Sequence, residues 1–181
     1  MARTEGDYSW VVENHYGDVY RFALSLTHDE AEAADLTQEA FWRLADRFLE
    51  IRDVRRMKSW LFTTLHREFI GRRKRQNRYP HVHLEETELE LPAISSVSEL
   101  TVDGKTALET LAEVEEVFRA PLALFYLEDY SYAEIGEILG IPLGTVMSRL
   151  SRGKARLQQL LADRTLPSQS ARLIPFPSKA A

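Results

Sequence analysis

The residues best suited to bind a charged ligand lie within residues 143–157, LGTVMSRLSRGKARL. If this segment is a helix, with about 100° between successive residues, one side of it combines hydroxyl and guanidinium groups. These groups belong to Thr145, Ser148, Arg149, Arg152 and Arg156. A guanidinium can donate two hydrogen bonds to a base edge or to a phosphate. Because charged helix faces are more often only solvated, this pattern needs support from the residues around it.

The preceding residues predict that this segment is the second helix of a helix-turn-helix. Ser131 and Glu134 have the spacing of a capping box, which starts a helix near residue 132. Gly140 provides a left-handed stop after two turns, and Pro142 suits the first turn of the next helix. The apolar stripe of the first helix consists of Ile135, Ile138 and Leu139. Two helices joined by a short turn that contains glycine match the helix-turn-helix pattern.

A helix-turn-helix places its second helix in the major groove of DNA and presents the first residues of that helix to base edges. In this sequence those residues are Thr145, Ser148 and Arg149, whereas Arg152 and Arg156 lie farther along, where phosphates are the expected partners. The packing face of the same helix is predicted to consist of Val146, Leu150, Gly153 and Leu157.

A second polar surface lies on the helix predicted at residues 29–49. Asp35, Gln38, Glu39 and Trp42 share one side of this helix with Asp46. The core stripe opposite is predicted to consist of Ala34, Phe41, Leu44, Ala45 and Phe48. An exposed tryptophan among polar residues is typical of a protein–protein hot spot, although a large aromatic residue is usually at least partly buried. The sequence leaves both interpretations of Trp42 open.

A third surface lies on the helix predicted at residues 59–76. Its core side is predicted to be Leu61, Phe62, Leu65 and Phe69. The far side consists of Trp60, Thr63, Thr64, Arg67, Gly71 and Lys74. Aromatic and basic residues on one face can stack on unpaired bases and neutralise a nucleic-acid backbone. Trp60 could equally be a core residue at the start of the helix.

Composition predicts an all-α protein. The chain has 181 residues with 8 Gly, 7 Pro and no Cys, so disulfides, thiol catalysis and Cys-based zinc sites are excluded. His81 and His83 are the closest pair of histidines and are more typical of a loop than of a metal site, so we expect no metal or cofactor. No apolar run is long enough to cross a membrane, and the start, MARTEGDYSW, lacks the apolar core of a signal peptide. We therefore expect a cytoplasmic protein without membrane insertion.

The net charge of −5 conceals two neighbouring segments of opposite charge. Residues 66–79 contain one acid, Glu68, and the bases Arg67, Arg72, Arg73, Lys74, Arg75 and Arg78. Residues 85–103 contain acidic residues and no base. Such asymmetry is a recognised indication of a nucleic-acid-binding segment beside an acidic one.

Two small helical domains are predicted, joined by an acidic flexible linker. The N-terminal domain spans residues 1–78, the linker 79–104, the C-terminal domain 105–164, and a disordered tail 165–181. The N-terminal helices are predicted at residues 8–27, 29–49 and 59–76. Apolar periodicity after the linker consists of Leu108, Leu111, Val114, Val117, Phe118, Leu122, Phe125 and Tyr126.

Three blocks resemble the extracytoplasmic-function (ECF) sigma factors, the compact bacterial transcription initiation factors of the sigma superfamily. DEAEAADLTQEAFWRLADRF is similar to the helix of that family that binds core polymerase. SWLFTTLHREFIGRRKR resembles its promoter-melting helix, which reads the minus-ten element, and LFYLEDYSYAEIGEILGIPLGTVMSRLSRGKARL resembles its domain for the minus-thirty-five element. The resemblance covers residues 8–162, and the blocks DLTQEAF and GTVMSRL at this spacing are specific.

The resemblance implies an alternative sigma factor that binds core RNA polymerase and directs promoter-specific initiation on double-stranded and melted DNA. The implied polymerase contacts are Asp35, Gln38, Glu39 and Trp42. The implied minus-ten contacts are Trp60, Thr64, Arg67, Arg72, Lys74 and Arg75. The implied minus-thirty-five contacts are Thr145, Ser148, Arg149, Arg152 and Arg156. The acidic linker would thread toward the polymerase active centre, and an anti-sigma factor is a candidate further partner.

The chain departs from the family pattern at four positions. Arg67 and Gly71 stand where the family commonly has Asn and Asp, and Gly136 and Met147 stand where it has Ala and Lys. Base recognition by the minus-ten helix is therefore expected to differ from that of the family.

Three other classes of function are alternatives to a sigma factor. A stand-alone helix-turn-helix regulator with an N-terminal sensor domain would explain residues 105–162, but it would not explain the two N-terminal surfaces. A helical adaptor that binds only protein is the second alternative. No Ser-His-Asp set, phosphate-binding glycine loop or carboxylate-histidine metal spacing is present, so no enzymatic activity is expected.

Overall fold

The computed structural model describes residues 7–51, 53–78 and 108–165, and within these ranges it contains helices, turns and no strand. The all-α prediction is therefore confirmed. The N-terminal unit consists of α1 (Tyr8–Thr27), α2 (Glu30–Arg47) and α3 (Met57–Arg78), and the C-terminal unit contains α5 (Glu116–Tyr126), α6 (Tyr132–Leu139) and α7 (Leu143–Thr165). The predicted linker at residues 79–104 and residues 166–181 of the predicted tail lie outside the described residues, whereas Thr165 belongs to α7.

Local capping interactions set the junction between α1 and α2. His28 ends α1 in the left-handed region with φ 56°, and its N–H donates to the carbonyl of Leu24. Asp29 then caps α2, because its side chain accepts a 2.7 Å hydrogen bond from the N–H of Glu32. The predicted break at His28 and Asp29 is confirmed, and the helix starts one residue later than predicted because a cap residue is not itself helical.

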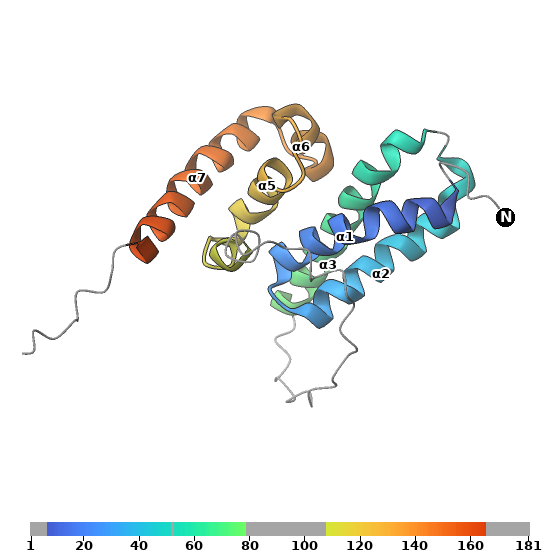
Figure 1. The fold of residues 1–181 in the computed structure, drawn as a ribbon, viewed down its shortest axis with the longest axis horizontal. Coiled ribbons are helices and arrows are strands. Elements are labelled where there is room, and N and C mark those ends of the chain that lie inside the picture. The colour runs from blue at the N-terminus through green and yellow to red at the C-terminus, as the bar shows by residue number, and fades with distance from the viewer. Residues whose placement is uncertain (1–6, 52, 79–107, 166–181) are drawn as a thin grey trace, which may run out of the picture.

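The three N-terminal helices pack around an apolar core (Figure 1). The predicted core side of α3 is confirmed, since Leu61, Phe62, Leu65 and Phe69 are all buried. The predicted stripe of α2 is confirmed at Phe41 and Leu44, which are buried, and wrong at Ala45, which is exposed, while Ala34 is only half-buried. Its buried residues are Ala33, Leu36, Thr37, Ala40, Phe41 and Leu44. The stripe is rotated because α2 packs against α1 and α3 at once.

The connection between α2 and α3 is more ordered than predicted. Two 3-10 turns, Phe48–Glu50 and Val54–Arg56, occupy it, and the Asp53 side chain accepts from the N–H of Arg55 at the start of the second. α3 begins at Met57, before the predicted residue 59, because Met57 is itself buried in the core.

The predicted helix-turn-helix is confirmed. Both hydrogen bonds of the Ser131 and Glu134 capping box are present, and Gly140 ends α6 with φ 65°. α7 begins at Leu143, so Pro142 lies just before the helix, where its carbonyl accepts from the N–H of Val146 at 3.1 Å.

Two residues of the predicted stripe, Val117 and Tyr126, are exposed. A turn at residues 113–115 separates α5 from the preceding helical residues, and α5 packs against α7. The helices cross closely at Gly153, where an added Cβ would lie 3.0 Å from the Phe118 Cβ.

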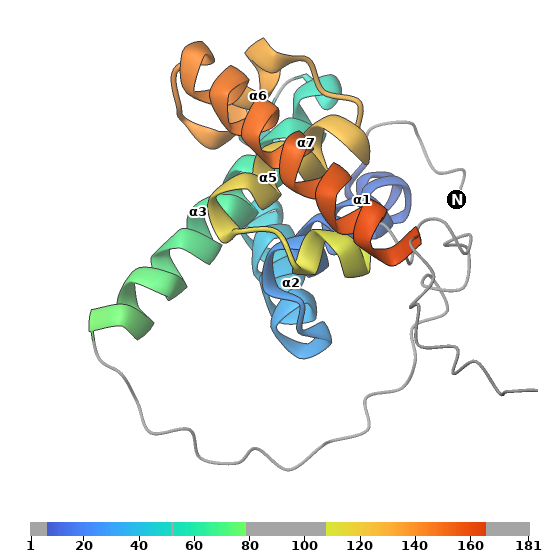
Figure 2. The same cartoon turned by 90° about the vertical axis from the view of Figure 1, so that its left-hand side faces the viewer.

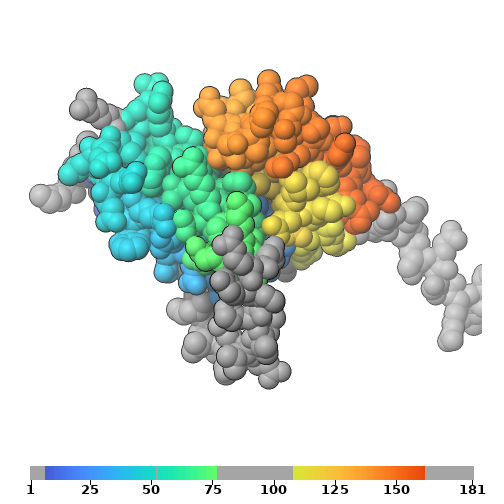
Figure 3. Space-filling model, turned by 180° about the vertical axis from the view of Figure 1, so that it is seen from behind, coloured from blue at the N-terminus to red at the C-terminus, as the bar shows by residue number. Residues whose placement is uncertain are grey.

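The two units lie in contact. α5 packs against α1, and α6 packs against α3. Figure 2 shows the C-terminal helices crossing over the N-terminal bundle, and Figure 3 shows them lying beside α3. The C-terminal unit therefore borders the same helix whose outer face was predicted to contact DNA.

Candidate nucleic-acid interface

The polar face predicted on α2 is present at the surface. Asp35, Gln38 and Trp42 are exposed, and 63% of the surface of Trp42 is accessible. The interpretation of Trp42 as a core residue is therefore wrong. Glu39 is half-buried and accepts a 2.7 Å hydrogen bond from Arg43 Nε, whose guanidinium also lies 3.0 Å from Glu68 on α3. Arg43 thus connects the polar face of α2 to α3.

An exposed apolar residue after α2 was missed from the sequence. Leu49, in the 3-10 turn that follows α2, is 96% exposed. No local pattern in the sequence indicates this exposure.

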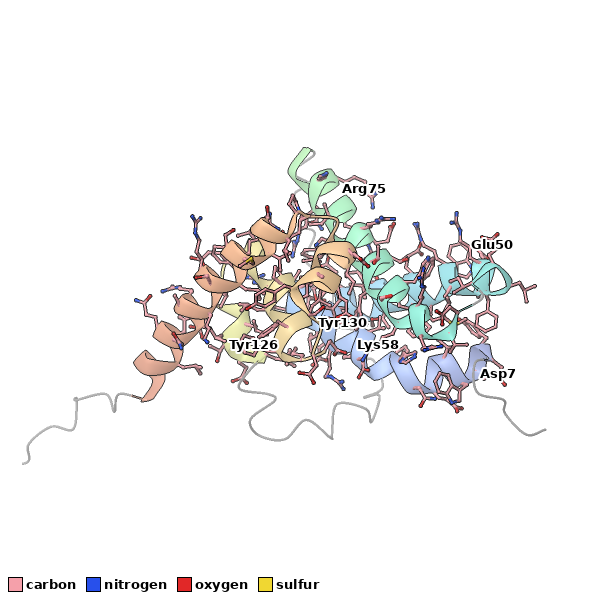
Figure 4. The ribbon with its side chains drawn as sticks, turned by 90° about the horizontal axis from the view of Figure 1, so that it is seen from above. Asp7, Glu50, Lys58, Arg75, Tyr126 and Tyr130 are labelled. Atoms are coloured by element: carbon pink, nitrogen blue, oxygen red, sulfur yellow. The ribbon has the colours of Figure 1, made fainter. Side chains whose placement is uncertain are left out.

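A cleft of about 1070 Å³ lies along the outer face of α3. Three of the six predicted minus-ten residues line it, namely Trp60, Thr64 and Arg67. Trp60 is half-buried against the core, so each of its two sequence interpretations holds in part. Lys74 and Arg75 are exposed and Arg72 half-buried on a later part of α3, and Figure 4 shows Arg75 toward its far end.

The cleft gathers more positive charge than the sequence analysis assigned to it. Four further arginines line it: Arg43, Arg47, Arg55 and Arg56. Arg55 and Arg56 come from the segment between α2 and α3, which sequence reasoning treated only as a connection. The dense basic composition of that segment was the signal that could have identified them.

The opposite wall of the cleft belongs to the C-terminal unit and is acidic. Glu134 and Glu137 on α6 line it together with Tyr130. Arg149 on α7 acts on His66 of α3: burial, followed by the charges of Arg149 and Arg67, lowers the pKa of His66 to about 4. Arg149 itself is half-buried.

The predicted packing face of α7 is confirmed, and the predicted DNA-binding face contains both exposed and half-buried residues. Val146, Leu150 and Gly153 are buried, and Leu157 is half-buried. Ser148 and Arg152 are exposed, whereas Thr145 and Arg156 are half-buried. Arg156 donates a 3.0 Å hydrogen bond to Gln159 on its own helix.

No helix in the described ranges is both long enough and apolar enough to cross a membrane. In the same ranges, no three metal-binding side chains of the His, Cys, Asp or Glu type come together.

Two family models match the chain in order. Sigma-70 region 2 matches residues 11–79, and Sigma-70, region 4 matches residues 105–157. These matches coincide with the N-terminal helical unit and with the helix-turn-helix unit.

Several known proteins are similar along most of the chain. The ECF RNA polymerase sigma factor SigE of Mycolicibacterium smegmatis is 35% identical over 165 residues, which are 85% of this chain and 62% of that protein. The ECF RNA polymerase sigma factor SigL of Mycobacterium tuberculosis is 33% identical over 154 residues, which cover 83% of this chain and 86% of that protein.

Solved structures show the same arrangement of helices. The sigma factor RpoE of Bartonella quintana, in complex with the anti-sigma factor NepR, has a TM-score of 0.68 and 26% identity, and the match covers 86% of this chain and 97% of RpoE. CnrH, at 19% identity and a TM-score of 0.58, supports the fold alone. The ordered region matches and the relatives of similar length show that the chain belongs to the ECF family of RNA polymerase sigma factors.

Proposed function

We propose that this ECF sigma factor binds core RNA polymerase through α2 and reads its promoter through α3 and α7. The observation that carries the proposal is the occurrence, in family order, of an exposed tryptophan on α2, a cleft along α3 lined by arginines and carboxylates, and a helix-turn-helix. Run-off transcription with purified core polymerase on genomic fragments tests it. Specific transcripts that require both core polymerase and this chain are expected.

The polymerase-binding face consists of Asp35, Gln38, Glu39 and Trp42. Its support is the combination of a large exposed aromatic ring with acidic and amide groups on one side of a helix whose other side is core. Exposed aromatic residues at the centre of a polar patch dominate protein–protein binding energy.

The minus-ten face consists of Trp60, Thr64, Arg67, Arg72, Lys74 and Arg75. Its support is the arginine-lined cleft beside the half-buried indole of Trp60. An aromatic ring offers a stacking platform for an unpaired base, and guanidinium groups neutralise the phosphates of the same strand. Melted promoter DNA therefore suits this face better than a closed duplex.

The minus-thirty-five face consists of Thr145, Ser148, Arg149, Arg152 and Arg156 on α7. Its support is their place on the second helix of a helix-turn-helix, the element that enters the major groove. The proposed partner of this face is duplex DNA, whereas the proposed partner of the face on α3 is melted DNA.

The two arginines of α7 are expected to act differently. Arg149→Ala should cost about 1 to 3 kcal/mol and change preference at one or two base pairs, because Arg149 lies where a bidentate base contact forms. Arg152→Ala should weaken binding to all sequences alike, as loss of a phosphate contact does. Transcription from a randomised minus-thirty-five library measures both effects. Equal activity and preference in both variants and wild type would contradict the assignment.

Arg67 is expected to select a guanine at the upstream edge of the minus-ten element. A guanidinium donates to both O6 and N7 of guanine, whereas the Asn common in the family pairs best with adenine. Arg67→Asn should therefore shift that preference, with discrimination changed by about 1 to 3 kcal/mol. A promoter-library selection on both proteins measures it. Uniformly lower activity with unchanged base preference would instead mean that Arg67 holds a phosphate.

The remaining properties follow from this role. The chain acts as a non-catalytic initiation factor in the cytoplasm, where RNA polymerase works. An anti-sigma factor is a candidate regulator, because the similar RpoE of Bartonella quintana is known in complex with one. A stand-alone regulator is not favoured, and DNA binding discriminates the two: a regulator would bind its operator without core enzyme.

A further inference from the structure

The first two turns of α7 carry two large apolar side chains that belong to none of the proposed faces. Leu143 is the first residue of the helix, Met147 follows one turn later, and each residue is 52% exposed. The packing side of the same turns consists of Val146 and Leu150, which are buried. Leu143 and Met147 therefore contribute to the surface of the C-terminal unit and not to its core. We name these two residues the apolar edge.

The apolar edge borders the side of α7 that faces away from the core. Ser148 and Arg152 are both exposed on that side. With about 100° between successive residues, Met147 flanks Ser148 on one edge and Arg149 flanks it on the other. Leu143 precedes Met147 by four residues and so lies on the same edge as Met147. One edge of this side is thus apolar, and the opposite edge is basic.

The space next to the apolar edge is open. Gly144 follows Leu143 directly, and a Cβ added to it would meet no side chain within 4 Å among the described residues other than its two chain neighbours. α7 packs against α5 and α6 (Figure 1) with its buried side, which leaves the apolar edge uncovered. The edge of a base pair can therefore approach the first turns of α7.

The hydroxyl group beside the apolar edge is committed within the helix. Ser148 Oγ donates a 3.0 Å hydrogen bond to the carbonyl of Thr145, so its hydrogen is not available to a base in this conformation. Arg149, on the opposite edge, is half-buried, and its charge acts on His66 of α3. At the apolar edge, contact with a base therefore has to be made by carbon and sulfur atoms.

The base edges in the major groove of DNA offer one apolar group, the C5 methyl of thymine. Apolar side chains of DNA-binding proteins contact this methyl, and the first residues of a recognition helix are those that meet base edges. Methionine is suited to such a contact because its side chain is unbranched and its thioether is polarizable. The chemistry of the apolar edge thus matches thymine and not the polar edges of the other three bases.

We propose that the apolar edge reads thymine methyl groups in the minus-thirty-five element and that Met147 is its specificity-determining residue. The inference rests on the proposed assignment of α7 to minus-thirty-five DNA. The lysine that the family has at this position can donate hydrogen bonds to guanine, whereas Met147 has no donor and buries a methyl group instead. This chain therefore prefers a T·A pair where a chain with that lysine gains from guanine.

Replacement of thymine by uracil in the promoter tests this inference, because uracil lacks only the C5 methyl and pairs with adenine in the same way. Run-off transcription with purified core polymerase first identifies a promoter among genomic fragments. Selection from a library randomised over its minus-thirty-five element then gives the preferred bases. Templates with deoxyuridine at each selected thymine in turn are compared at limiting holoenzyme. At one or two thymines, loss of the methyl should lower initiation about fourfold, as expected from the burial of one such group.

Variants of Met147 assign the effect to its side chain. Met147→Ala should initiate equally well from the thymine and uracil templates, because the side chain that buries the methyl is gone. Met147→Leu should keep the difference, since it preserves an apolar side chain of similar size. Leu161→Ala is the matched control: it removes a large apolar side chain that is 39% exposed on the same helix but outside its first turns, and it should also keep the difference. Circular dichroism checks that each variant is folded.

Equal initiation from thymine and uracil templates by the unchanged protein would overturn the methyl reading, as would the absence of thymine from the selected element. An undiminished difference in Met147→Ala would overturn the assignment to Met147. Failure of the proposed function is a separate result: a chain that gives no core-dependent transcript from any template is not acting as proposed, and the inference falls with it.

Discussion

Replacing Asp35 and Trp42 together by Ala is expected to abolish co-purification of the chain with core RNA polymerase while leaving its helical content and cooperative melting unchanged. Trp42 is exposed and Asp35 shares its side of α2, so neither contributes to the core of the free protein. Loss of a hot-spot tryptophan costs about 2 kcal/mol or more of binding energy, and removal of a neighbouring acid adds to it. Affinity capture of tagged core enzyme measures the loss.

Tyr126→Ala provides a control for this experiment, because Tyr126 is an exposed aromatic residue of the C-terminal unit. It should leave co-purification intact. If Trp42→Ala alone unfolds the protein, the residue belongs to the core after all. If the double variant remains bound to polymerase, the contact surface lies elsewhere, and Leu49, exposed in the 3-10 turn after α2, is the next residue to test.

Features determined within one or two helical turns could be predicted from the sequence. The capping box of Ser131 and Glu134, the left-handed stop at Gly140 and the cap at Asp29 depend on side chains and backbone groups a few residues apart. The core side of α3 could also be predicted, because its large apolar residues recur at helical spacing and these residues are buried in the structure.

The phase of the α2 stripe could not be predicted in the same way. Alanine gives little indication of which side of a helix is buried, since its small side chain is tolerated both inside and outside the core. The buried side of α2 is set by contact with two neighbours, α1 and α3, and this choice exposes Ala45 while it buries Ala33 and Ala40. Tertiary packing therefore determines which side of α2 is buried, and the residue types of α2 do not.

Contacts between the two units could not be predicted from the sequence either. Lys58 Nζ lies 2.8 Å from Glu128 Oε2, but the two residues are far apart in the chain, and nothing in either local pattern indicates that they meet. The same holds for Arg149 on α7, whose charge contributes to the lowered pKa of His66 on α3. Sequence therefore identified the candidate surfaces, while the structure added which of them oppose each other.

Phe62 is expected to give the largest loss of stability of any residue on α3. Its side chain is fully buried, its ring meets Phe22 of α1 at 5.1 Å between centroids, and Tyr130 of the C-terminal unit lies on another side. Phe62→Ala should lower the free energy of unfolding by about 3 to 5 kcal/mol, because the deletion leaves a cavity that neighbours on several helices must line. Urea denaturation followed by circular dichroism measures the change.

Leu49→Ala is the control for Phe62, since it also removes a large apolar side chain, but from a position that is 96% exposed. It should change the free energy of unfolding by no more than about 0.5 kcal/mol, as surface substitutions do. Because proteins of this kind are stable by only about 5 to 15 kcal/mol, the predicted cost at Phe62 is a large share of the total and should be visible as a lower urea midpoint. Equal midpoints for the two variants would mean that the ring of Phe62 does not connect α1 and α3 as described.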